Sequence, residues 1–182
     1  MAFAVSLLFN SDIASAISER WKRLADAGIS SSMLDLKYPP HVTLGVYDEL
    51  SLDAVVGRLD RVFHHVDQIA VTLAGLSTFG SGSGVCYAAL APAPDLMRLH
   101  ATIIATIGET CRPHYQPGRW TPHCTLAMGM TAAEMDRARS LLEQDWRSLA
   151  GRFEMADLVE FAPVAGVKRW PLVPTPHSTR TP

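Results

Sequence analysis

Two short motifs, each with a histidine and a threonine, are the part of this sequence best suited to chemistry. The first begins at His41 and reads His-Val-Thr-Leu, the second begins at His123 and reads His-Cys-Thr-Leu, and a proline precedes each. The 182-residue chain carries one motif in each half. A histidine gains and loses a proton near neutral pH, so two of them flanking a reacting group provide one base and one acid. The pair predicts one proton-transfer site shared by two halves.

Each motif has the pattern of a β-strand with one polar face. Side chains alternate between the two faces of a strand, so His41 and Thr43 share one face, as do His123 and Thr125. The residues between and after them are apolar and belong to the opposite, buried face. The preceding proline removes a backbone donor and favours extended backbone in the residue before it. Each strand should therefore present an imidazole and a hydroxyl on one surface.

The elements around the motifs are predicted to occur twice in the same order. That order is strand, helix, motif strand, helix, strand, and such a repeat indicates an internal duplication. The repeat units span approximately residues 1–79 and 84–162, and a loosely ordered tail is expected at 171–182 after a strand at 167–173. The fold class predicted is α+β, with two pseudo-symmetric lobes in a single bilobal domain, 1–182. Hydrophobic periodicity places strands at 3–9, 68–76, 85–90 and 153–161, and helices at 12–27, 51–64, 95–107 and from a capping box at 131–134 onward.

The composition disfavours several classes of protein. Sixteen basic and eighteen acidic residues give a net charge of −2, so the chain as a whole does not attract a long nucleic acid. The three cysteines form no CxxC pair, which disfavours a disulfide framework and a zinc site and favours a reducing compartment. No apolar stretch approaches the length of a membrane span. We expect a cytoplasmic protein with no membrane contact.

The spaced pair of H-x-T-x motifs resembles the two-histidine (2H) phosphoesterase superfamily, and within it the 2′-5′ RNA ligase-like branch. The segment 76–96, with Phe79, Gly80 and Tyr87, is similar to the centre of those proteins, and the run 120–123 is similar to their approach to the second motif. The resemblance covers most of the chain. It implies antiparallel sheets that face a central cleft, with helices packed outside and one H-x-T pair on each wall.

The resemblance also implies hydrolysis of 2′,3′-cyclic phosphates or related nucleotide phosphodiesters, with no metal and no other cofactor. His41 and His123 would be the base and acid, on opposite sides of the phosphorus, and their order is left open. Thr43 and Thr125 would each donate a hydrogen bond to a non-bridging oxygen. The roles would swap in the reverse, ligation direction. The expected partner is an RNA terminus or a small nucleotide, and no obligate protein partner is predicted.

Five residues in the loops that lead into the motifs are candidates for substrate binding. A cation can pair with a phosphate, and an aromatic ring can stack on a base. The alternative for each is a structural role, because an aromatic side chain can cover a core and a loop lysine can be a solvated charge. The other histidines are interpreted as structural or exposed. The candidates are Lys37, Tyr38, Tyr115, Arg119 and Trp120.

Other substrates and one other class of protein remain open. The alternative substrates are 2′-5′-linked oligonucleotides and a cyclic phosphate that is not RNA. The alternative class is a non-catalytic module that binds RNA or a nucleotide, although binding alone does not require a matched acid and base. A metal held by His41 and His123 would lack a carboxylate or cysteine ligand at suitable spacing.

Overall fold

Apart from two short helices that the sequence pattern does not predict, the helices and strands follow one another in the predicted order. The computed structural model describes residues 2–80, 83–108, 110–161 and 163–174. The first half contains β1 (Ala2–Phe9), α1 (Ser11–Asp26), α2 (Ser32–Asp35), β2 (His41–Tyr47), α3 (Leu52–Phe63) and β3 (Ile69–Phe79). The second half contains β4 (Gly84–Leu90), α4 (Pro94–Ile107), the 3-10 helix η1 (Pro113–Tyr115), β5 (His123–Met130), α5 (Ala132–Glu143), β6 (Leu149–Phe161) and β7 (Ala165–Pro171).

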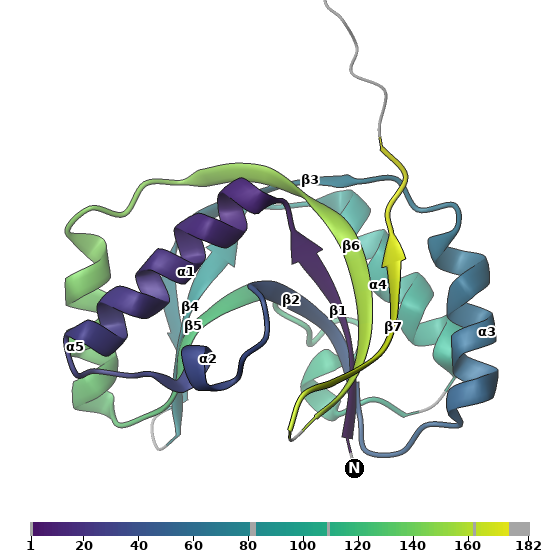
Figure 1. The fold of residues 1–182 in the computed structure, drawn as a ribbon, viewed down its shortest axis with the longest axis horizontal. Helices are drawn as coiled ribbons and strands as arrows, with labels where there is room; N and C mark the ends of the chain where they lie inside the picture. Colours follow the sequence, from purple (N-terminus) through teal and green to yellow (C-terminus); the bar gives the residue numbers. More distant parts are fainter. Residues whose placement is uncertain (1, 81–82, 109, 162, 175–182) are drawn as a thin grey trace, which may run out of the picture.

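The named strands form one open antiparallel sheet, and the predicted α+β class is confirmed. The strand order is β2-β1-β6-β3-β4-β5. On the edge of β6 away from β1, β3 pairs with residues 149–153 and β7 pairs with residues 155–160. The two antiparallel sheets expected from the resemblance are thus joined through β6 and β3. Because β6 pairs with β1 and β3 pairs with β4, each half gives its last strand to the sheet of the other. Figure 1 shows β3 and β6 running across the top of the arched sheet.

The long helices lie in two pairs on the outer side of the sheet (Figure 1). α1 packs beside α5 and against β5, although α1 belongs to the first half. α4 packs beside α3 and against β2, although α4 belongs to the second half. The halves therefore exchange a helix as well as a strand, and each motif strand is backed by a helix from the opposite half.

The main core fills the space between the helices and the sheet. α1 buries the apolar stripe that its helical spacing predicts, Ile13, Ile17, Trp21 and Leu24. Burial of one such large apolar side chain stabilises the fold by about 1.5–3 kcal/mol. A second, smaller cluster lies on the other face of β1 and contains Ala4, Leu8, Tyr38, Val46 and Val159.

Two local expectations have different outcomes. The capping box at the start of α5 is confirmed, since the Thr131 hydroxyl accepts from the Glu134 backbone and the Glu134 carboxylate accepts from the Thr131 backbone. The tail differs from the expectation up to residue 174: Leu172 is only 2% exposed, and the backbone N–H of Val173 donates to the carbonyl of Val66. An apolar side chain that reaches the core holds this stretch in place. Residues 175–182 lie outside the described part.

No helix in the described ranges combines the length and the apolar composition needed to cross a membrane.

Candidate active site

The two motif strands present their polar residues on one face, as alternation requires. On β2, Val42 and Leu44 are completely buried, whereas His41 and Thr43 are partly exposed. β5 repeats this pattern of burial through its own motif. The buried pair anchors each strand in the core, and the imidazole and hydroxyl are left on the open surface.

Each motif histidine is held by the backbone just before it. Nδ1 of His41 lies 2.8 Å from the carbonyl oxygen of Pro39, and Nδ1 of His123 lies 2.8 Å from the carbonyl oxygen of Thr121. A carbonyl oxygen can only accept a hydrogen bond, so Nδ1 carries the proton in both rings. Nε2 is then the atom that exchanges a proton with the surroundings. The two walls thus share one tautomer.

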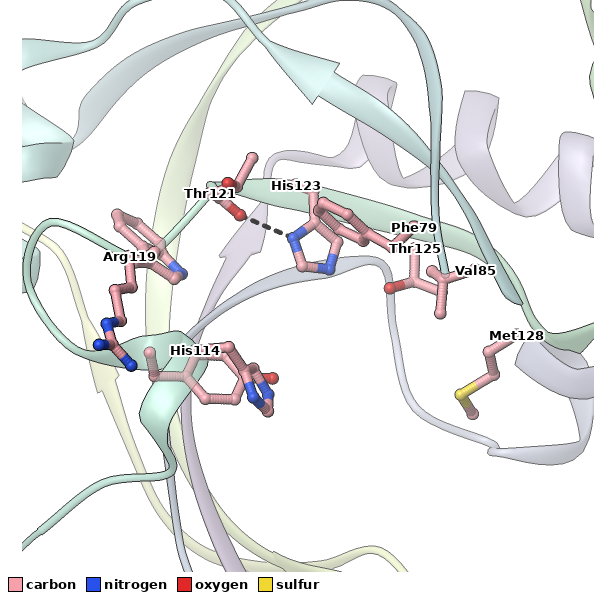
Figure 2. Close-up of a pocket in the computed structure, with 10 residues that line it drawn as sticks. Phe79, Val85, His114, Arg119, Thr121, His123, Thr125 and Met128 are labelled. Atoms are coloured by element: carbon pink, nitrogen blue, oxygen red, sulfur yellow. Dashed lines mark hydrogen bonds between the residues drawn. The ribbon is translucent and has the colours of Figure 1, made fainter. Parts of the chain in front are cut away.

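Two adjoining cavities lie along these histidines. The cavity on the His123 side has a volume of about 470 Å³, and the cavity on the His41 side has a volume of about 190 Å³. Tyr115, Thr125 and Met128 line both cavities, so the two form one cleft. Figure 2 shows His123 and Thr125 extending from β5 toward the larger cavity, with Arg119 and His114 across from them.

The His41 wall is polar and hydrogen-bonded. The ring of Tyr38 packs against His41 with centroids 4.6 Å apart, and its hydroxyl donates to Asp157, 3.3 Å away. Asp157 is only 1% exposed and also accepts two bonds from the guanidinium of Arg169. Ser6 lies between this group and Thr43, with its Oγ 3.5 Å from Oγ1 of Thr43. In the strand register, Thr43, Ser6, Asp157 and Arg169 form one polar row across β2, β1, β6 and β7.

The His123 wall is aromatic. Phe79 and Tyr87 stack with centroids 4.1 Å apart, and both rings contact His123 at about 5 Å. Tyr87 is the residue that pairs with Thr125 across β4 and β5. The two walls therefore share a backbone arrangement and differ in the chemistry that surrounds each histidine.

The cleft disfavours charge on both histidines when it holds no anion. The pKa of His41 is lowered to about 4, chiefly by burial; the hydrogen bond to the Pro39 carbonyl opposes this change, and the neighbouring charge of His123 adds to it. Burial also lowers the pKa of His123, and His114 adds to this effect, while the Thr121 carbonyl opposes it. Neutral imidazoles are thus favoured at neutral pH, and a bound anion would favour the protonated form.

The residues predicted to bind substrate occupy different places. Tyr38 lines the smaller cavity, Arg119 and Trp120 line the larger one, and Tyr115 lines both. Lys37 lies outside the cleft, exposed in a shallow hollow beside α1, with a backbone φ of 53°. Trp120 is almost completely buried, so it also has the structural role that was its alternative interpretation.

Several residues in the cleft or directly behind it were not identified from the sequence as site residues. His114 belongs to the histidines interpreted as structural or exposed; it is exposed, yet it lines the larger cavity. Met128 lines both cavities although it reads as one more apolar strand residue. Ser6 and Asp157 did carry a signal, because each is a small polar residue inside an otherwise apolar stretch of strand.

A metal centre finds no support in the described ranges, where no group of three or more His, Cys, Asp and Glu side chains is arranged to hold an ion. Cys124, next to His123, points into the core, and burial raises the pKa of its thiol to about 12. It is therefore a buried apolar residue and not a nucleophile at neutral pH.

Comparison with known proteins gives a family and a fold. Residues 12–163 match the model of the 2′-5′ RNA ligase superfamily. A search of curated protein sequences found no match.

Several solved structures share the fold. TT0787 of Thermus thermophilus is 18% identical, with a TM-score of 0.67 over 94% of this chain and 98% of that one. E. coli LigT complexed with 3′-AMP is 15% identical, with a TM-score of 0.59 over 93% and 97%. Kluyveromyces marxianus Usb1 is 16% identical, with a TM-score of 0.56 over 94% and 98%. At these identities the likeness concerns the fold.

Proposed function

The chain belongs to the 2′-5′ RNA ligase superfamily of 2H phosphoesterases, and on that premise we propose that it hydrolyses 2′,3′-cyclic phosphates. The substrate proposed is an RNA end or a small nucleotide. His41 and His123 are the acid–base pair, and no metal takes part, because the two imidazoles supply both proton transfers. The same site run in reverse would join ends through a 2′-5′ linkage.

The observation that carries this proposal is that both histidines have the same tautomer and the same position on their strands. Both rings are fixed through Nδ1 to the carbonyl two residues earlier, so both expose Nε2. Each stands two residues before a threonine on the same strand face, in one of two motif strands that border a common cleft. A site that only bound a phosphate would need donors, and cations such as arginine serve that purpose better than two neutral imidazoles.

The reaction assigns one proton transfer to each ring. The neutral histidine takes a proton from water through Nε2 while the water oxygen bonds to phosphorus. The bond from phosphorus to the leaving ribose oxygen breaks on the opposite side, and the charged histidine gives that oxygen its proton. The Thr43 and Thr125 hydroxyls donate to the non-bridging oxygens, where negative charge grows. The product is a 2′-phosphate by analogy with the family, and solvent then restores both rings.

The cleft suits a nucleotide-sized anion. The larger cavity, at about 470 Å³, has the size usual for small-molecule sites, the smaller one extends it toward His41, and Arg119 and His114 at the larger one can pair with phosphate. No aspartate or glutamate is among the described residues that line either cavity. Among proteins of this fold, LigT was solved with 3′-AMP and Usb1 with uridine monophosphate. Arg119, Tyr115, Tyr38 and Trp120 are the proposed substrate contacts here, and Lys37 would reach only a longer substrate.

Product analysis tests the proposal directly. The chelator-treated protein and its His41→Ala and His123→Ala variants are incubated with 2′,3′-cyclic nucleotides and with an oligoribonucleotide that ends in a cyclic phosphate. We expect conversion to a 2′-phosphate that survives chelation and falls by orders of magnitude in both variants. Full activity in His123→Ala, or loss of activity on chelation, contradicts the mechanism.

The alternatives are separated when 2′-5′-linked oligonucleotides are added to this set of substrates and binding is measured beside turnover. Turnover of 2′-5′-linked oligonucleotides alone would change the substrate class and keep the site. Binding of these ligands with no turnover, weakened but not abolished in His41→Ala, would identify a binding module.

A further inference from the structure

Each motif strand is hydrogen-bonded to a tryptophan from the other half of the chain. Trp120, in the second half, donates its indole N–H to the carbonyl oxygen of Thr43, 3.0 Å away. Trp21, on α1 in the first half, donates its indole N–H to the carbonyl oxygen of Thr125, also 3.0 Å away. Both tryptophans are buried. The two halves thus hold each other's motif threonine by the same kind of bond.

Both bonds end beside a β-bulge. On β2, Leu44 is an extra residue between Thr43 and Gly45, which pair with consecutive residues of β1. On β5, Leu126 is the extra residue at the same place in the motif. A bulge interrupts the ladder of backbone hydrogen bonds and re-aims nearby side chains. At each interruption, the indole N–H is a partner for the threonine carbonyl.

A second bond from the opposite half follows a few residues further along each motif strand. The backbone N–H of Arg112 donates to the carbonyl oxygen of Val46 at 2.8 Å. The backbone N–H of Met128 donates to the hydroxyl of Ser32 at 3.1 Å. Val46 and Met128 occupy the same position relative to their motif histidines. Each motif strand is therefore fixed at two points to the half that carries the opposing histidine.

We infer that Trp21 and Trp120 are positioning residues that fix the two motif strands relative to each other, so that His41 and His123 face one phosphorus from opposite sides. This inference rests on the proposed function. In-line transfer is sensitive to geometry, and a displacement of about 1 Å can cost roughly 100-fold in rate. A buried indole that donates to a backbone oxygen resists such a displacement. Neither tryptophan transfers a proton itself.

The four tryptophans of the chain form a matched series for the test. Trp146 has a buried indole N–H with no partner among the described residues. Trp170 donates its indole N–H to Asp60 of α3 at 2.6 Å and packs on Phe63, on the helical side of the sheet. A change to phenylalanine removes the N–H and keeps an aromatic ring. Trp146→Phe therefore measures the effect of the smaller ring when no indole bond is lost. Trp170→Phe measures the effect of losing an indole bond that does not reach a motif strand.

We expect Trp21→Phe and Trp120→Phe to lower kcat by about 10- to 100-fold, at a temperature where circular dichroism shows every variant folded, and we expect Trp21→Phe to leave KM little changed. Trp146→Phe and Trp170→Phe should keep the kcat of the unmodified protein. Trp21→Phe is the stricter test, because Trp21 lines neither cavity of the cleft, whereas Trp120 lines the larger one. An unchanged kcat in Trp21→Phe, or an equal loss in Trp170→Phe, overturns the inference.

A second readout does not depend on turnover. NMR signals of the histidine rings should show that Trp21→Phe moves the signals of His123 and that Trp146→Phe leaves them in place. Unmoved His123 signals in Trp21→Phe overturn the inference as well. If the unmodified protein hydrolyses no phosphodiester, the proposed function fails, and these signals still decide whether Trp21 holds the His123 strand.

Discussion

Ser6 and Tyr87 occupy equivalent positions in the two walls of the cleft, each paired with the motif threonine of the neighbouring strand. Ser6 brings a hydroxyl close to Thr43, whereas Tyr87 brings a ring that stacks on Phe79 and contacts His123. The two walls have the same strand pairing, but different side chains surround His41 and His123. The two histidines should therefore differ in proton affinity, and equivalent changes in the two halves should have unequal effects.

The pH dependence of catalysis should reflect the lowered pKa values of both histidines. A reaction that needs one neutral and one charged imidazole is fastest between the two pKa values. Both pKa values lie below the ordinary 6.5, that of His41 at about 4, so kcat/KM should peak below pH 6.5. Bound phosphate favours the charged ring, so kcat should peak at a higher pH than kcat/KM. Rate profiles measured against pH check this, and a kcat/KM maximum at pH 7 or above would contradict it.

Removal of either motif hydroxyl should slow the chemical step more than it weakens binding. Thr43→Val and Thr125→Val keep the branched shape of the side chain and lose the donor to the phosphate. Loss of one such donor typically costs about 100- to 1000-fold in kcat. Steady-state kinetics with a cyclic nucleotide measures the effect, and Thr43→Ser and Thr125→Ser are the controls that keep the hydroxyl. A rise in KM at unchanged kcat would show that the threonines only bind substrate.

Removal of Arg169 alone should destabilise the fold, because its partner Asp157 is buried. Asp157 is buried, so Arg169→Met leaves a carboxylate without its cation and should lower the free energy of unfolding by about 3 kcal/mol. Arg169→Met combined with Asp157→Leu removes both charges and should recover most of that loss. Urea unfolding of the two variants measures the difference. Equal stability of the single and double variants would show that an unpaired buried carboxylate is not what destabilises Arg169→Met.

Gly151 should resist substitution because α1 begins directly against it. Gly151 pairs with Val71 where β3 meets β6, and a Cβ added there would overlap the side chains of Asn10 and Ile13. Gly151→Ala should therefore lower the free energy of unfolding by about 1–3 kcal/mol. Gly75→Ala on β3 is the matched control, because a Cβ at Gly75 meets nothing within 4 Å. Thermal unfolding of both variants tests the contrast.

The sequence contained the local information on this fold. The helix spacing of α1 predicted its buried face, the alternation in the motifs predicted which side chains share a surface, and the start of α5 was read from Thr131 and Glu134. Asn10 shows the limit of this reasoning. It is the N-cap residue of α1, a position where an asparagine side chain usually bonds the first turn, but its side chain accepts a bond from the backbone of Arg152 instead. A tertiary contact took the place of the local one.

The contacts between distant segments could not be predicted from the chain alone. Nothing in the strand patterns indicates that β3 and β6 are exchanged between the halves, because strand pairing depends on the whole sheet. The helical spacing predicts that Trp21 is buried, as it is, but its bond to Thr125 follows only from α1 lying over the opposite half. The same holds for Arg169, which β7 brings beside Asp157.

Because β3 and β6 are exchanged, neither half of the chain could form a complete sheet by itself. Residues 2–79 alone would lack the strand beside β1 and would expose β3 as a free edge, and edges of this kind pair with whatever strand is available. Two copies of one half would complete each other by domain swapping into a symmetric dimer. The covalent link between β3 and β4 makes that association intramolecular, and therefore independent of protein concentration. His41 and His123 therefore lie in one site at any protein concentration.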